Sequence, residues 1–212
     1  MADSAVPPEP ESPQLSTVEQ WRTFLTSYSA DVLRAAESYE WCDVTEDQLA
    51  AGWLGFEGAS EQQLAAVERR LGMRLPPSYR AFLGASDGWW HLGPFMYEMR
   101  TTETVGWLRD TEPTFWKMLH SHGGDEAAFM DRVLLVSAVG DAQYWLLDPG
   151  EVSPAGEWTA YTWASWHPGL SMPSASFGQL VIDQRRSFEE LSDEHEYTYD
   201  PSSRAGGPKA PR

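Results

Sequence analysis

The residues best suited to chemistry in this sequence are a single cysteine, five histidines and 32 acidic residues. Cys42 with His91 or His167 would supply a nucleophile and a base for covalent catalysis. A lone cysteine is more commonly a partly buried thiol, so we expect no catalytic pair. Pairs of carboxylates hydrolyse glycosides, but acids are so abundant here that no particular pair stands out. We therefore predict no catalytic residues.

One segment has the residue types of a metal site. His120 and His122 precede Asp125 and Glu126 across two glycines. Alternate residues of a helix point in different directions, so these groups could share an ion only in a loop. We expect a solvated helix end, with no metal and no other cofactor.

Motifs for phosphate and ester chemistry are absent from the sequence. It has no glycine-rich phosphate loop with lysine, no dinucleotide-binding fingerprint, no nucleophile elbow and no HExxH pair. With 15 basic against 32 acidic residues the net charge is -17, which repels nucleic acid and attracts basic partners. We predict a protein that is not an enzyme and binds no nucleic acid.

Tryptophan is unusually frequent, with 11 in 212 residues. Such aromatic side chains fill a core or a protein interface more often than they stack on sugars. Two groups of tryptophans stand out. The first is Trp89 with Trp90, and the second is Trp158 with Trp163 and Trp166. The predicted partner-contact residues are Asp87, Trp89, Trp90, Asp141 and Trp145.

The first half of the chain has the patterns of helices. Apolar residues at helical spacing predict an amphipathic helix over about 17–37, followed by an acidic connector over 37–57 that holds a short helix. Ser60 and Gln63 form a capping box for a helix ending at Leu71, where Gly72 follows. Pro76 and Pro77 preset the first turn of a third helix that ends before residue 84.

The second half is rich in strand-forming residues. Branched and aromatic runs predict strands over 132–139, 144–147 and 157–163, with a turn at Asp148-Pro149-Gly150. Helices are predicted over 113–120 and from Ser176, where Gln179 repeats the capping pattern. Because helices precede strands and a helix follows, the fold class is α+β, with helices packed around a mainly antiparallel sheet and an extra N-terminal helix.

Composition divides the chain into four parts. Proline-rich residues 1–14 predict a disordered leader, 15–51 an N-terminal helical extension, 52–191 the main domain and 192–212 a disordered tail. No secretion signal and no membrane span is recognisable, and one cysteine fits a reducing compartment. We therefore expect a cytoplasmic protein with no membrane partner.

The stretch from Gly58 to Trp90 resembles the Smi/Knr-type SUKH domain in the order of its motifs. The matching residues are Glu68, Leu71, Gly72, Leu75, Pro76, Tyr79, Phe82, Leu83 and Gly88. Farther along, Gly140-Asp141 before the aromatic run at 144–147, and Ser176-Phe177, resemble the family's later turn and closing helix. The family turn usually has more glycines, and its asparagines are absent here.

The resemblance implies a single α+β domain that binds other proteins and supplies no catalytic residues. Bacterial relatives serve largely as immunity proteins that neutralise toxins, often nucleases, whereas fungal relatives act as scaffolds in cell-wall and signalling control. Residues 141–200 hold eleven acids against Arg185 and Arg186, an acidic half suited to a basic toxin. The alternatives are an acidity that only maintains solubility, and a regulator that binds a carbohydrate or small ligand.

Overall fold

The computed structural model describes residues 14–36, 44–122, 125–138, 140, 142–166, 170 and 173–198. Most of the predicted leader, part of the predicted tail, and Cys42, Asp141 and His167 lie outside these ranges. The helices are α1 (Val18–Ala36), α2 (Glu46–Ala51), α3 (Glu61–Leu71), α4 (Pro77–Ala85), α5 (Leu108–Thr111), α6 (Pro113–His122), α7 (Asp125–Met130) and α8 (Phe177–Thr198). The strands are β1 (Trp89–Trp90), β2 (Glu98–Met99), β3 (Gly106–Trp107), β4 (Leu134–Leu135), β5 (Gln143–Val152) and β6 (Trp158–Ala164). This composition confirms the α+β class.

Local capping signals place the early helices where the sequence predicts them. Ser60 Oγ accepts from the amide of Gln63, whose side chain returns to the Ser60 amide, and this capping box starts α3. Gly72 ends α3 in the left-handed region at φ 77°, which a glycine adopts without strain. Pro77 occupies the first turn of α4, where no helical amide is needed.

The strands form two antiparallel sheets, and isolated bridges extend the smaller one on both sides. β1 pairs with β2, and the second sheet has the order β3-β4-β5-β6. Gly55 bridges to Trp89 on one side of the small sheet, and Met99 bridges to Ser137 on the other. The chain beside Gly55 therefore forms the outer border of the small sheet.

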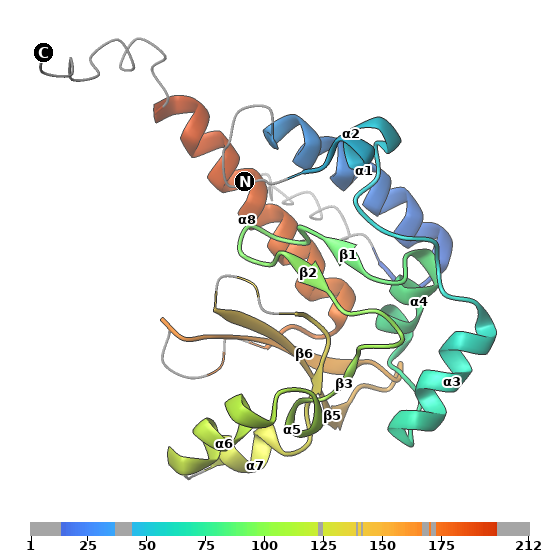
Figure 1. Ribbon diagram of the computed structural model, residues 1–212, viewed down its shortest axis with the longest axis vertical. Helices are drawn as coiled ribbons and strands as arrows, with labels where there is room; N and C mark the ends of the chain where they lie inside the picture. The colour runs from blue at the N-terminus through green and yellow to red at the C-terminus, as the bar shows by residue number, and fades with distance from the viewer. Residues whose placement is uncertain are drawn as a thin grey trace, which may run out of the picture.

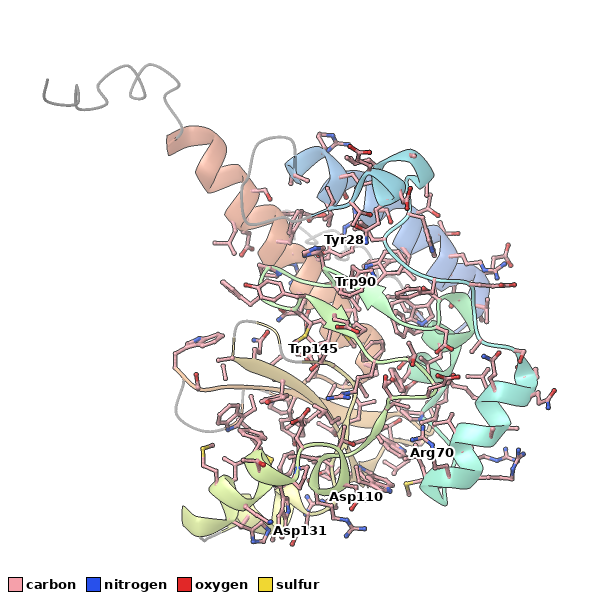
Figure 2. The ribbon with its side chains drawn as sticks, in the orientation of Figure 1. Tyr28, Arg70, Trp90, Asp110, Asp131 and Trp145 are labelled. Atoms are coloured by element: carbon pink, nitrogen blue, oxygen red, sulfur yellow. The ribbon has the colours of Figure 1, made fainter. Side chains whose placement is uncertain are left out.

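The larger sheet is covered on both faces, so successive side chains along a strand enter different cores. On β5, Trp145 and Leu147 join the main core, whereas Tyr144 and Leu146 join a second core. Figure 1 shows α1, α4 and α8 gathered on one side of this sheet and the short helices α5, α6 and α7 on the other. Trp145, labelled in Figure 2, lies beneath α8 at the centre of the molecule.

Helix α1 is built into the main core. Trp21 is fully buried, and its Nε1 donates to the Ser78 carbonyl of α4 at 2.8 Å. Its ring lies 5.2 Å from the ring of Phe82 and 5.6 Å from that of Phe177. Helix α1 of the predicted N-terminal extension is thus part of the main core.

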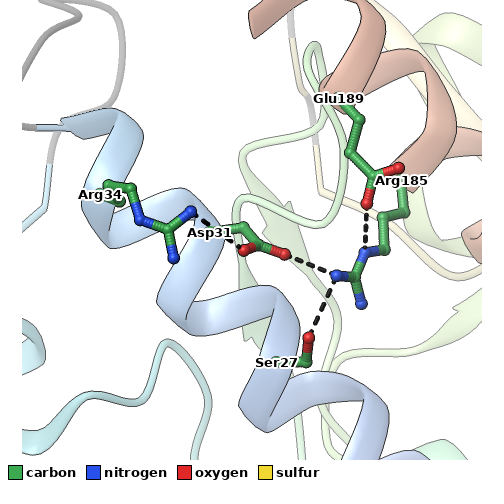
Figure 3. A network of polar contacts seen from close by, with 5 residues as sticks. All are labelled: Ser27, Asp31, Arg34, Arg185 and Glu189. Carbon is green, nitrogen blue, oxygen red and sulfur yellow. Dashed lines mark hydrogen bonds and ion pairs between the residues drawn. The ribbon is translucent and has the colours of Figure 1, made fainter.

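An arginine of α8 fastens α1 to the last helix (Figure 3). Arg185 Nη2 donates to Asp31 Oδ2 at 2.6 Å and to Ser27 Oγ at 3.1 Å, and its Nε donates to Glu189 at 2.8 Å. The guanidinium also lies over the ring of Phe24, 5.2 Å from its centroid. The first and last helices are therefore held together by charge and aromatic contacts.

The sequence prediction of a turn at Asp148-Pro149-Gly150 is wrong. Asp148-Pro149-Gly150 is part of β5, where the register with β6 shifts between Asp148 and Val152. Asp148 Oδ1 accepts from the Gly150 amide and the carboxylate also binds Arg132, so the turn-forming residues make a bulge and the chain reverses after Val152. Helix α8 continues to Thr198, beyond the predicted domain limit at 191.

Candidate partner-binding surface

The surface is organised by the turn at Ser86-Asp87-Gly88, between α4 and β1. Ser86 Oγ accepts from the Phe56 amide at 2.8 Å and donates to the Gly88 carbonyl at 2.6 Å. Gly88 has φ 102°, and a Cβ there would lie 3.0 Å from the Thr101 side chain. The turn therefore needs a glycine and fixes how β1 leaves α4.

Strand β1 sends its two tryptophans to opposite faces. Trp89 is fully buried against Trp53, at a centroid distance of 4.7 Å, whereas Trp90 is half-buried on the outer face. Trp90 lies 6.2 Å from the ring of Phe56, whose side chain is 44% exposed. Figure 2 shows Trp90 on the small sheet. We call Phe56, Glu57, Trp90 and Glu98 the aromatic-acidic surface.

The two acids of the aromatic-acidic surface have no salt-bridge partner among the described residues. Glu98 is directly opposite Trp90 in the register of β1 and β2, and Glu57 follows Phe56 and is exposed. Neither carboxylate forms a salt bridge with another described residue. A pair of aromatic rings beside free acids is the arrangement that suits a basic protein partner.

The structure separates the five predicted contact residues. Trp89 and Trp145 are fully buried, so their prediction as contact residues is wrong: both indoles fill the main core. Asp87 uses its carboxylate internally, because Oδ1 accepts from the Thr102 amide at 2.6 Å and Oδ2 from the Thr102 hydroxyl at 2.8 Å. Asp141 lies outside the described residues. Trp90 alone of the described four presents a ring to the outer face.

The residues that carry the family resemblance are structural in this chain. Leu71, Leu75, Tyr79, Phe82 and Leu83 are all buried in the main core. Burial raises the pKa of the Tyr79 hydroxyl, so this group stays protonated at any ordinary pH.

Glu68 and Pro76 shape the step from α3 to α4. Glu68 Oε1 accepts from the Leu75 amide and from Arg80 Nε, both at 3.2 Å. Pro76 occupies the N-cap of α4, with φ −63°. The carboxylate therefore ties the loop between the two helices to α4.

The structure does not bring the tryptophans of the sugar-binding alternative, at 158–166, together on one exposed surface. Trp158 is buried at 4% exposure, and Trp163 is half-buried with its ring 4.6 Å from that of Phe115. Trp166 is 54% exposed and contacts Phe95 at 6.2 Å. One exposed indole with an edge-on neighbour does not make the flat surface that sugar stacking requires.

The histidine-rich segment contains a hydrogen-bonded pair in the described part of the chain. His120 Nε2 lies 2.8 Å from Asp131 Oδ1, and Trp116 Nε1 donates to the same oxygen at 2.9 Å. The hydrogen bond to His120 is the main cause of a lowered pKa for Asp131. The side chains of His122, Asp125 and Glu126 lie outside the description, and within it no three potential ligands gather around a metal position.

Several carboxylates of the predicted acidic half are engaged within the protein. Asp148 is buried and receives two hydrogen bonds at 2.7 Å from Arg132. Glu157 accepts from both the amide and the hydroxyl of Ser78. Glu189 binds Arg185. These carboxylates hold elements together, so the total count of acids overstates the charge available to a partner.

Phe56 was not among the sequence candidates, although the sequence held a signal for it. Phe56 lies between Gly55 and Glu57 in a stretch with no basic residue. Few neighbouring residues along this stretch could bury an apolar side chain. A Cβ at Gly55 would lie 2.2 Å from Ser86 Oγ, so the backbone approaches the turn closely there. That close approach directs Phe56 onto Trp90.

These helices packed on antiparallel sheets, with the Leu-Pro-Pro step and Ser-Asp-Gly turn, define a SUKH-type domain. The sequence model of the SMI1 / KNR4 family (SUKH-1) matches residues 58–183, so the chain belongs to this family. The predicted resemblance is thereby confirmed, while the predicted limits of 52–191 stay a prediction. No curated protein matches the chain. Among the described residues, no helix combines the length and apolar character needed to cross a membrane.

Proposed function

We propose that this chain is an immunity-type SUKH protein that binds a basic toxin domain and blocks it without catalysing a reaction. The observation that carries the proposal is the aromatic-acidic surface, where the exposed ring of Phe56 contacts the half-buried ring of Trp90, and where Glu57 and Glu98 have no salt-bridge partner among the described residues. Aromatic anchors with surrounding charge are typical of protein hot spots. The net charge of -17 supports attraction of a basic partner.

The mechanism follows from charge and burial. Uncompensated acids accelerate encounter with a positively charged active face, and the rings of Phe56 and Trp90 are then removed from water. A toxin whose basic substrate-binding face is covered cannot engage a polyanionic substrate. No group of this chain changes its bonds in the process.

The test combines growth with binding rates. If a neighbouring reading frame encodes a basic toxin, cells producing that toxin are expected to grow when this chain is co-expressed, and to stop growing with the Phe56→Ala, Trp90→Ala double variant. Trp166→Ala removes an exposed indole outside the aromatic-acidic surface and is the matched control. The association rate is expected to fall steeply with salt.

Two results would contradict the proposal. One is full protection by the double variant, because the rings then contribute nothing to the contact. The other is an association rate that stays flat as salt rises, because the acids then do not attract the partner.

A further inference from the structure

Two arginines of this chain show how it binds a guanidinium group. Arg185 lies over the ring of Phe24, 5.2 Å from the centroid, and donates to Asp31 Oδ2 at 2.6 Å. Arg132 repeats this arrangement, 5.4 Å from one ring centroid and paired with one carboxylate at 2.7 Å. In both places an aromatic ring and a carboxylate hold the same cation.

The aromatic-acidic surface is a third set of rings and carboxylates. Trp90 and Glu98 are directly opposite in the register of β1 and β2, so their side chains leave the same face, with Cβ atoms about 4.5 to 5.5 Å apart. The next pair, Trp89 and Met99, is fully buried on the other face. The ring of Phe56 is inclined by 50° to that of Trp90. Within the described ranges, no arginine or lysine makes a cation–π contact with either ring.

The cation nearest to Glu98 along the chain is used elsewhere. Arg100 follows two residues later, but it donates to Glu112 Oε1 at 2.9 Å and to the Ser137 carbonyl at 2.8 Å. Its side chain is only 14% exposed. Arg100 therefore leaves the Glu98 carboxylate without a salt bridge, as do the other cations of the described residues.

Main-chain hydrogen bonds fix the positions of the ring and the acid. The Trp90 amide donates to the Leu54 carbonyl at 3.0 Å, and the Glu98 carbonyl accepts from the Ala138 amide at 2.9 Å. The small sheet is thus paired on both sides at this level. Only the Glu98 side chain has to become ordered when a ligand binds, which keeps the entropic cost low.

We infer that Trp90, Phe56 and Glu98 bind an arginine side chain of the partner protein, with the guanidinium stacked on Trp90 and paired with Glu98. Arginine suits this surface better than lysine, because its planar fork stacks on a ring and matches both oxygens of a carboxylate. Glu57, which is exposed beside Phe56, adds a second negative charge. The inference rests on the proposed function, since it names the side chain that the proposed partner places on this surface.

The experiment titrates the isotopically labelled full chain with acetyl-Gly-Arg-Gly-amide and, separately, with acetyl-Gly-Lys-Gly-amide, both at constant ionic strength. The indole N–H signal of Trp90 is assigned through Trp90→Phe. This signal is expected to move with the arginine peptide and to saturate at about 10 to 100 mM, an affinity that one exposed side chain can supply. The lysine peptide is expected to bind about threefold more weakly, because an ammonium group stacks less well and is more strongly hydrated.

Three variants test which groups make the contact. Glu98→Gln is expected to weaken the arginine peptide about threefold, since one surface ion pair is lost. Phe56→Leu keeps an apolar side chain but removes the ring, and is expected to weaken this peptide about twofold. Glu151→Gln removes an exposed acid of β5, outside the aromatic-acidic surface, and is the matched control that binds like the wild type. Amide spectra of the variants establish that each one is folded before its affinity is compared.

Several results would overturn the inference. They are a Trp90 signal that moves equally with both peptides or with neither, a Glu98→Gln variant that binds like the wild type, and an equal loss in Glu151→Gln. The last result would show attraction by net charge alone. Each of them leaves the proposed function standing if the chain still protects cells from the toxin. Arginine binding through Trp90 and Glu98 without protection of cells would instead contradict the proposed function alone.

Discussion

Replacing Trp21 by Ala tests whether α1 belongs to the fold or is an appendage to it. Trp21 lies outside the matched range 58–183, yet it is fully buried and donates a hydrogen bond to Ser78 of α4. Truncating a buried tryptophan to alanine costs about 3 to 5 kcal/mol in free energy of unfolding, because packing is lost and a cavity remains. We expect Trp21→Ala to lose stability in that range.

A second substitution separates packing from hydrogen bonding. Trp21→Phe keeps a ring against Phe82 and Phe177 but removes the indole N–H, leaving the Ser78 carbonyl without this donor. Ser78 lies in α4, where helical hydrogen bonding also uses its carbonyl, so losing the indole donor costs about 0.5 to 1.5 kcal/mol. Trp21→Phe is therefore expected to lie between the wild type and Trp21→Ala.

The assay is urea unfolding of the full chain followed by far-ultraviolet circular dichroism, which is insensitive to the number of tryptophans left. Thr23→Ala is the matched control, since Thr23 is exposed on the same helix and its hydroxyl donates to the Glu19 carbonyl of that helix. It is expected to change stability by less than about 0.5 kcal/mol. A loss below about 1 kcal/mol for Trp21→Ala would refute the packing of α1 described above, because exposed positions have effects of that size.

Three further predictions concern the core, a buried carboxylate and pH. Phe82→Ala is expected to lose about 3 to 5 kcal/mol in urea unfolding, since Phe82 is fully buried, and near-normal stability would contradict its place in the core. Asp148→Asn is expected to lower the free energy of unfolding by about 1 to 2 kcal/mol, because the buried acid receives two hydrogen bonds from Arg132, which is itself half exposed. If the substitution causes no further loss in a variant that already lacks Arg132, the pair is the cause. Asp131 has a lowered pKa in the folded state, so its stabilising contribution is present at neutral pH and is lost as the pH falls through that value, below about pH 4. His120→Ala should raise the pKa of Asp131 in a carboxyl carbon NMR titration, and an unchanged value would contradict the hydrogen bond as its cause.

Local signals predicted the early helices well because their causes are local, whereas the short helices α5 and α7 were not predicted. The capping box of Ser60 and Gln63 and the left-handed Gly72 are read within one or two turns of chain, and both are present. The β5 bulge could not be predicted in this way. Asp148 and Gly150 have turn chemistry, but Arg132 binds Asp148 from sixteen residues away and keeps the segment in the sheet.

The candidate site could not be predicted fully, because the sequence does not show which face of a strand is buried. Strand alternation requires Trp89 and Trp90 to point to opposite faces, but only the packing of Trp89 against Trp53 decides which one is buried. Successive side chains of β5 enter two different apolar cores. Trp145 would therefore be buried whichever face of the sheet it occupied. Phe56 is brought beside Trp90 by a turn thirty residues away.

The junction of the first and last helices by Arg185 has a consequence for synthesis. Asp31 and Arg185 are separated by 154 positions, so a ribosome adding about 5 to 20 residues per second needs roughly 8 to 30 s between them. Until then Phe177 is not available for Trp21 to pack against. The apolar face of α1 stays accessible to chaperones and to other chains during this time. Maturation of this protein is consequently a late event, completed only after its final helix has left the exit tunnel.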